Sequence, residues 1–102
     1  GLVFAMREES AFRQELFLAV VLVPVALWMP ATVVETTLML ASLVIVLIVE
    51  LLNSSVEAAV DRISYSKHGL SKRAKDYGSA AVMLAIMLCG AVYALIAAKY
   101  YL

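Results

Sequence analysis

Three carboxylates and one amide recur along one stretch of the chain, residues 50–61, at a spacing typical of a single helical face. The four side chains are Glu50, Asn53, Glu57 and Asp61. At about 100° per residue, these positions fall within roughly 80° around a helix axis. Closely spaced carboxylates repel one another unless a cation lies among them. The stripe therefore predicts a site for a divalent metal ion.

The position of the stripe relative to an apolar run also suggests a functional site. Glu50 directly follows residues 37–49, which carry no charge. Ionisable groups near a membrane boundary are costly, and they persist where they face a bundle interior, a water-filled cavity or a bound cation. We therefore interpret Glu50 and Glu57 as functional residues. Asp61 fits equally well as a polar side chain on a helix that is leaving the membrane.

The composition places the chain among membrane proteins. Of its 102 residues 65% are hydrophobic, and the mean hydropathy is +0.97. We predict a single all-α domain, residues 1–102, with three membrane spans at about 16–34, 37–52 and 80–98. The charged residues gather in a layer formed by residues 50–79 and 7–15. This layer is where we expect chemistry.

Local signals predict how the spans begin and end. Pro24 predicts a kink in the first span, and Thr36 or Glu35 is expected to cap the second helix. That helix should continue through the carboxylate stripe to about Ile63. A loop follows, and Ser71 is expected to cap the third helix.

Aromatic and basic residues are expected at the opposite membrane boundary. Trp28 at the end of the first span has the character of an interface anchor. The third span ends in a similar group, consisting of Tyr93, Lys99, Tyr100 and Tyr101. Small residues along the third span favour close helix packing, including packing between chains.

The distribution of charge predicts the topology and excludes one class of function. Five Lys and Arg lie between Arg62 and Lys75, whereas residues 30–37 contain none. Positive loops favour the cytoplasmic side, so both this loop and the N-terminus should be cytoplasmic and the C-terminus external. Eight basic residues are balanced by eight acidic ones, which argues against a nucleic-acid-binding surface.

The few cysteine and histidine side chains limit the metal chemistry. Cys89 is the single cysteine and His68 the single histidine, so a zinc-type site is not expected. We interpret Cys89 as a small core or lipid-facing residue and His68 as an exposed loop residue. Any metal site must therefore be built from oxygen ligands.

Two further groups of charges are expected at the depth of the stripe. Glu9 could meet Glu57 if the helices that carry them pack together. Lys75 suits a phosphate as a point charge, and Asp76 could orient Lys75 or accept a hydroxyl proton. Both could equally be ordinary boundary charges. The apolar segment 1–6 does not start with an initiator Met, and we expect a longer N-terminal segment, including a surface-lying helix, before the first span.

Three segments together resemble the prokaryotic integral-membrane diacylglycerol kinase family. They are residues 9–15 (ESAFRQE), 49–62 (VELLNSSVEAAVDR) and 73–82 (RAKDYGSAAV). The pattern E-x-x-N-S-x-x-E-x-x-x-D followed by K-D-x-x-S is a specific signal of this family. The three segments occur in the same order and at the same spacing as in the family, and the resemblance covers nearly the whole chain.

The resemblance implies a homotrimeric helical bundle in the bacterial inner membrane, with composite sites between neighbouring chains. Such enzymes transfer the γ-phosphate of ATP to diacylglycerol at the cytoplasmic face and form phosphatidic acid. By the family pattern, Glu9 and Glu57 would hold Mg²⁺ and Glu50 would be the catalytic base. Asn53 and Asp61 would support the site.

The resemblance also implies which residues contact the two substrates. The nucleotide would be bound by Glu9, Glu57, Ser66, Lys67, His68, Lys75 and Asp76. The lipid would be bound by Ala11, Phe12, Arg13, Gln14, Glu15, Glu50 and Ser79. The chain departs from the family pattern in two places. Acidic residues expected near Ser66 and Gly69 are absent, and residues 1–6 contain only a small part of the family's N-terminal surface helix.

Other functions remain possible from the sequence. Undecaprenol could replace diacylglycerol as the lipid alcohol with the same chemistry. A cation or proton pathway would need carboxylates spread through the depth of the bilayer, whereas these gather at one boundary. A purely structural oligomer would not explain why several polar residues share one layer. These residues are Glu50, Asn53, Glu57, Lys75 and Asp76.

Overall fold

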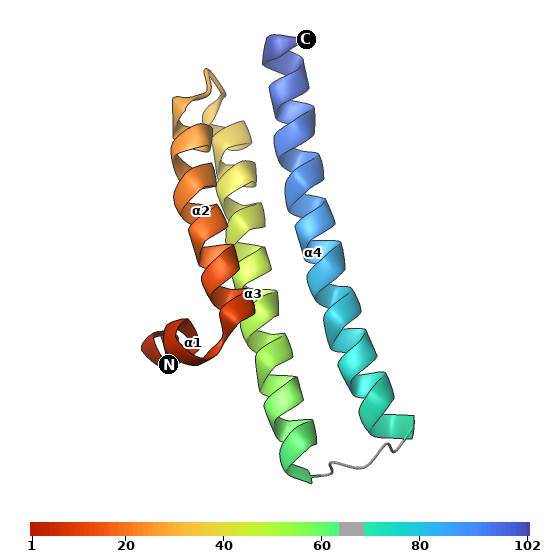
Figure 1. The fold of residues 1–102 in the computed structure, drawn as a ribbon. Helices are drawn as coiled ribbons and strands as arrows, with labels where there is room; N and C mark the ends of the chain where they lie inside the picture. Colours follow the sequence, from red (N-terminus) through yellow and green to blue (C-terminus); the bar gives the residue numbers. More distant parts are fainter. Residues whose placement is uncertain (64–68) are drawn as a thin grey trace.

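Four helices follow one another along the described part of the chain, residues 1–63 and 69–102 without the side chains of Met6, Glu8 and Ile63. In this computed structural model the helices are α1 (Leu2–Glu8), α2 (Ser10–Trp28), α3 (Val33–Ile63) and α4 (Gly69–Tyr101). The three long helices lie side by side, and α1 crosses the lower end of α2 (Figure 1). The predicted contact residues Ser66, Lys67 and His68 lie outside the described residues.

The three long helices confirm the predicted all-α membrane fold. The segments Ser10–Trp28, Val33–Arg62 and Gly69–Tyr101 are each long and apolar enough to cross a membrane. Helix α2 continues through Pro24 to Trp28, which a membrane helix tolerates when neighbouring groups satisfy the freed carbonyl. Helix α3 runs without interruption from the apolar run through the carboxylate stripe to Ile63, as predicted.

The start of α3 differs from the prediction. Thr32 and Glu35 form a reciprocal pair, in which the Glu35 N–H donates to Thr32 Oγ1 at 3.1 Å and the Thr32 N–H donates to Glu35 Oε1 at 2.9 Å. This capping box places the cap at Thr32, because the acidic partner must lie three residues after the capping residue. The prediction of Thr36 was therefore wrong, whereas the predicted Glu35 does take part in the cap through its carboxylate. Helix α4 likewise begins at Gly69, before the predicted cap Ser71.

A break at Glu9 separates α1 from α2. Glu9 has an extended backbone conformation, with φ −110° and ψ 107°, and its N–H donates to the Ala5 carbonyl. The break lets the apolar α1 turn away from the axis of α2, with Leu2, Val3 and Phe4 exposed. Glu9 consequently lies at a corner of the fold.

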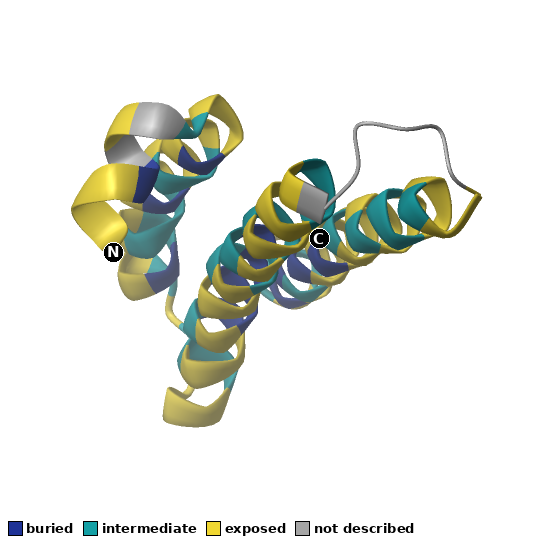
Figure 2. Cartoon of the chain, turned by 90° about the horizontal axis from the view of Figure 1, so that it is seen from below, coloured by how far each residue is buried: buried dark blue, intermediate teal, exposed yellow. Residues whose placement is uncertain are grey.

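Small and aliphatic side chains from all three long helices form the core. Its buried residues are Ala19 and Ala26 on α2, Met39, Leu43 and Val46 on α3, and Ala85, Cys89, Tyr93 and Ile96 on α4. The outward faces of the helices remain exposed (Figure 2) and carry many large apolar side chains. This pattern is typical of helices whose outer faces contact lipid or other chains.

Tyr93 lies inside this core. Its side chain is buried, and its hydroxyl donates to the Leu22 carbonyl at 3.0 Å, which joins α4 to α2. The prediction that Tyr93 marks the outer boundary was wrong, because Tyr93 lies on the face of α4 that packs against α2 and α3.

The end of the bundle away from α1 is held by Glu35 and the last turn of α4. Glu35 accepts hydrogen bonds from Lys99 Nζ, at 2.6 Å, and from the Tyr100 hydroxyl. Trp28 stacks on Tyr101, with ring centroids 6.2 Å apart and planes 8° from parallel. These contacts bring the α2–α3 turn and the C-terminus together.

Candidate functional site

Glu50 lies at the centre of a group of carboxylates from three parts of the chain, near the α1 end of the bundle. Glu50 on α3 is only 5% exposed, and the charges of both Glu9 and Glu57 act on it. Glu15 on α2 in turn experiences the charge of Glu50. Glu9 reaches this group because the break between α1 and α2 puts it at the corner next to α3. The predicted meeting of Glu9 with the stripe on α3 thus has a structural basis.

Asn53 joins Glu50 to the neighbouring helix. One turn further along α3, its side-chain amide hydrogen-bonds to Glu50. Its Oδ1 atom is buried and has no hydrogen-bond partner among the described residues. The amide lies against Gly78 on α4, where an added Cβ would overlap Oδ1 and lie 3.2 Å from Cγ. The predicted supporting residue therefore occupies the contact between α3 and α4.

Lys75 on α4 is held by the far end of the carboxylate stripe. Its Nζ lies 2.5 Å from Asp61 Oδ1, and both side chains are about half exposed. Asp76 pairs instead with Lys72, at 3.1 Å along the same helix. The expectation that Asp76 orients Lys75 was therefore wrong. Residues 75 and 76 are adjacent, so their side chains leave a helix in different directions.

The predicted lipid-binding residues on α2 divide between the interior and the surface. Phe12 is buried, whereas Ala11, Arg13 and Gln14 are exposed. Arg13 Nη1 donates to the Arg7 carbonyl at 3.0 Å and so helps to hold the turn between α1 and α2.

Glu15 is the residue of this segment that reaches the carboxylate group. Its Oε2 atom is buried and has no hydrogen-bond partner among the described residues. Glu15 also lines an apolar cavity of about 210 Å³ between α2, α3 and α4, together with Leu18, Leu22, Leu43 and Val46. Ser79 is exposed on α4, directly after Gly78.

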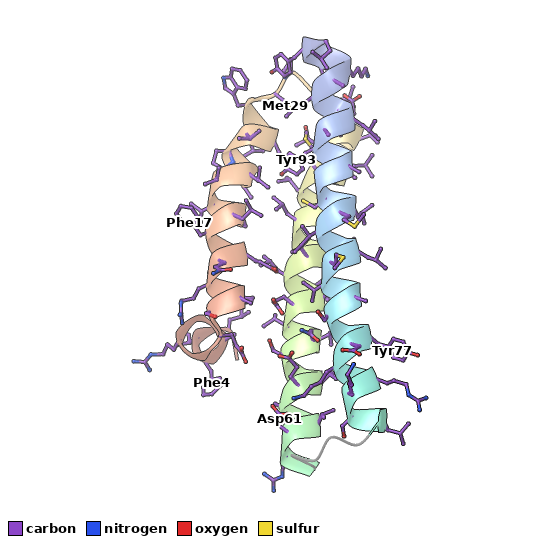
Figure 3. The ribbon with its side chains drawn as sticks, turned by 45° about the vertical axis from the view of Figure 1, so that its right-hand side comes forward. Phe4, Phe17, Met29, Asp61, Tyr77 and Tyr93 are labelled. Atoms are coloured by element: carbon purple, nitrogen blue, oxygen red, sulfur yellow. The ribbon has the colours of Figure 1, made fainter. Side chains whose placement is uncertain are left out.

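The charged layer occupies one end of the bundle. In Figure 3 the labelled Phe4, Asp61 and Tyr77 lie toward this end, and Met29 and Tyr93 lie toward the other. The polar residues discussed above come from α2, α3, α4 and the corner before α2. A substrate whose polar group stays at a membrane boundary could meet all of these elements.

The carboxylates provide suitable ligands for Mg²⁺. No group of three or more His, Cys, Asp and Glu side chains within the described residues forms a ready metal site. Mg²⁺ does not require one, because it keeps several waters and binds through one or two carboxylates together with substrate phosphates. Glu9 and Glu57, which both act on Glu50, match this ligand set.

Gly78 was not among the site residues predicted from the sequence. A glycine inside a helix costs about 1 kcal/mol relative to alanine, which is a signal that something else requires it. A glycine in a helix does not reveal which residue lies against it. Asn53 is identified as that residue only from the packing of α3 against α4.

Fold and site together define a multi-pass helical membrane protein with a layer of carboxylates, an amide and a lysine at one end of its spans. The chain belongs to the prokaryotic diacylglycerol kinase family, whose family model matches residues 1–97. The resemblance inferred from the sequence is thereby confirmed, and so is the class of lipid kinase.

Curated relatives match most of the chain. A diacylglycerol kinase from Haemophilus influenzae is 47% identical over 91% of this chain and 79% of its own length. One from Pseudomonas aeruginosa is 49% identical over 94% of this chain and 78% of its own length. One from Escherichia coli K12 is 47% identical over 86% of this chain and 72% of its own length.

Proposed function

We propose that this chain transfers the γ-phosphate of ATP to the hydroxyl group of diacylglycerol and forms phosphatidic acid. The relatives above carry the name diacylglycerol kinase. The observation that carries the proposal is the buried carboxylate of Glu50, which interacts with Asn53 and with the charges of Glu9 and Glu57 at one end of three apolar helices.

Glu50 is the proposed general base. Phosphoryl transfer to an alcohol needs a group that receives the hydroxyl proton as the oxygen attacks. A carboxylate held by a neighbouring amide at a membrane boundary suits a lipid alcohol, whose hydroxyl lies at that depth. Ser79 and the segment 11–15, of which Glu15 lies nearest Glu50, would contact the lipid.

Glu9 and Glu57 are the proposed metal ligands. When bound there, Mg²⁺ would neutralise charge on the transferring phosphate. Lys75 would add a fixed positive charge for the nucleotide, and Asp61 would hold Lys75 in place. Asp76 remains a proposed nucleotide contact, as do Ser66, Lys67 and His68, which lie outside the described residues.

We further propose that the carboxylate layer faces the cytoplasm and that the chain works as a homotrimer in the bacterial inner membrane. The basic residues between Arg62 and Lys75 support this orientation. The third span supports close association of chains, because several of its alanines are exposed: Ala80, Ala81, Ala91 and Ala94.

The decisive experiment measures transfer of labelled γ-phosphate from Mg-ATP to lipid in mixed micelles, with diacylglycerol and undecaprenol offered separately. We expect label on diacylglycerol. Glu50→Gln should abolish the transfer, because the amide cannot take the proton. Glu35→Gln is the matched control, since it changes a carboxylate at the opposite end of the bundle, and it should keep activity.

Each other outcome has a defined meaning. Label on undecaprenol alone would keep the chemistry and replace the lipid substrate. Full activity in Glu50→Gln would refute the role of the base. Absence of label on both lipids would refute the kinase proposal.

A further inference from the structure

We propose that Gly78 is a positioning residue for the phosphotransfer site, because its missing side chain leaves the space in which the Asn53 amide holds Glu50. This inference rests on the proposed function, in which Glu50 is the base. Gly78 itself would touch neither substrate.

The chemistry of the two partners fixes the orientation of the Asn53 amide. An ionised carboxylate only accepts hydrogen bonds, so the NH₂ group of Asn53 must face Glu50. The Oδ1 atom then points to the other side, where it is buried without a partner among the described residues. On that side lies Gly78 of α4.

The space at Gly78 is occupied by this amide. A Cβ atom at position 78 would overlap Asn53 Oδ1 and lie 3.2 Å from Asn53 Cγ and 3.8 Å from Asn53 Cβ. No glycine in the described part of the chain has a positive φ, so the backbone conformation does not require glycine here. Glycine is required at position 78 because the Asn53 side chain approaches it closely.

An added methyl group would move the amide and leave the helices in place. The overlapping atom is the free end of a side chain that can rotate, whereas Asn53 Cβ stays at an ordinary contact distance. Rotation of the amide would break its hydrogen bond to Glu50. We therefore expect Gly78→Ala to impair the chemical step in a protein that still folds.

The first test observes the amide directly and needs no activity. Asn53 is the single asparagine of the chain, so ¹⁵N-asparagine labelling gives one side-chain NH₂ signal in detergent micelles. Gly78→Ala should shift this signal and speed exchange of its protons with water. Gly90→Ala is the matched control, because a Cβ there meets nothing within 4 Å, and it should leave the signal unchanged.

The second test measures catalysis. Misplacement of a positioned catalytic group can cost up to about 100-fold in rate, so kcat should fall about 10- to 100-fold in Gly78→Ala. The KM for ATP should stay within about twofold of the wild-type value, because Gly78 is not expected to be energetically coupled to the nucleotide site. Gly90→Ala should keep its kcat.

A double variant distinguishes the positioning of Asn53 by Gly78 from a general role of Gly78 in helix packing. The same variant provides a test if Gly78→Ala alone does not fold. Asn53→Ala removes the overlapping atoms, so Asn53→Ala/Gly78→Ala should fold and match the kcat of Asn53→Ala within about twofold. A further drop in the double variant would assign Gly78 to packing alone and overturn the proposal.

Two other outcomes would also overturn it. One is an unchanged amide signal in a folded Gly78→Ala protein. The other is a shifted signal with unchanged kcat. A wild-type chain that transfers no phosphate would instead refute the proposed function, and the amide signal would still report whether Asn53 and Gly78 are in contact.

Discussion

Lys75 on α4 forms an ion pair with Asp61 on α3, with 2.5 Å between Nζ and Oδ1. The pair connects the last turns of α3, which carry the end of the carboxylate stripe, to the first turns of α4. It places a cation at the end of the layer that contains Glu50 and Glu57. Asp61 thereby acquires a partner that the sequence did not identify.

We predict that Asp61→Asn raises the KM for ATP by up to about fivefold, which is the range that a single exposed ion pair supports. Lys75 would keep its charge but lose the group that holds it. Steady-state kinetics with varied Mg-ATP measures the effect. Lys72→Met, which removes the partner of Asp76, is the control and should change KM less. An equal effect of both variants would contradict a specific role for Asp61.

Glu57→Ala should reduce phosphate transfer by about 100-fold or more, because it removes a proposed metal ligand next to developing charge. Glu57→Asp should retain activity but need more Mg²⁺ for half-maximal rate, since the shorter carboxylate reaches the ion less well. A titration of Mg²⁺ at fixed ATP tests both variants. An unchanged Mg²⁺ requirement in Glu57→Asp would argue against ligation by this residue.

Tyr93→Phe should lower stability by about 0.6 to 1.5 kcal/mol, because it removes the hydrogen bond to the Leu22 carbonyl and keeps the ring. Reversible unfolding in mixed detergent micelles measures the loss. Tyr101→Phe preserves the ring that stacks on Trp28 and should change stability less. Equal stability of Tyr93→Phe and wild type would show that the bond contributes nothing.

Glu35→Gln should make the protein easier to unfold without lowering kcat. The change weakens the contacts of Glu35 with Lys99 and Tyr100, which tie the C-terminal turn to the start of α3. Thermal unfolding in detergent and the phosphate-transfer assay together test this. A loss of kcat at a temperature where the variant is fully folded would connect the outer end of the bundle to catalysis.

The proposed orientation can be tested with single cysteines in a Cys89→Ser background. Val33 and Leu70 are both strongly exposed, and they lie at the starts of α3 and α4 respectively. A membrane-impermeant thiol reagent added to intact cells should label Val33→Cys and spare Leu70→Cys. The reverse pattern would invert the topology.

The predicted helices agree with the structure because their signals are local. Apolar runs long enough to span a membrane and the spacing of Glu50, Asn53 and Glu57 depend only on neighbours along the chain. The cap of α3 was misplaced although its signal is also local. Thr32 and Glu35 have the spacing of a capping box, a pattern that identifies the cap from neighbouring residues alone.

The partners of the site residues could not be predicted in the same way. The sequence indicated that Lys75 belongs to the charged layer but suggested Asp76 as its partner, whereas the structure pairs it with Asp61. Tyr93 was predicted to mark the membrane boundary because it is aromatic, whereas its side chain is buried in the core. Both outcomes depend on the rotation of α4 about its axis relative to α2 and α3.

The sequence by itself determined the membrane class, the helices, the family resemblance and the carboxylate stripe on one face of α3. Only the tertiary structure decided that Glu9 and Glu15 approach Glu50, that Asp61 holds Lys75, and that Gly78 makes room for Asn53. The physical reason is that helical periodicity follows from backbone geometry within one segment. Contacts between segments depend on how side chains of different helices pack, which no single stretch of sequence contains.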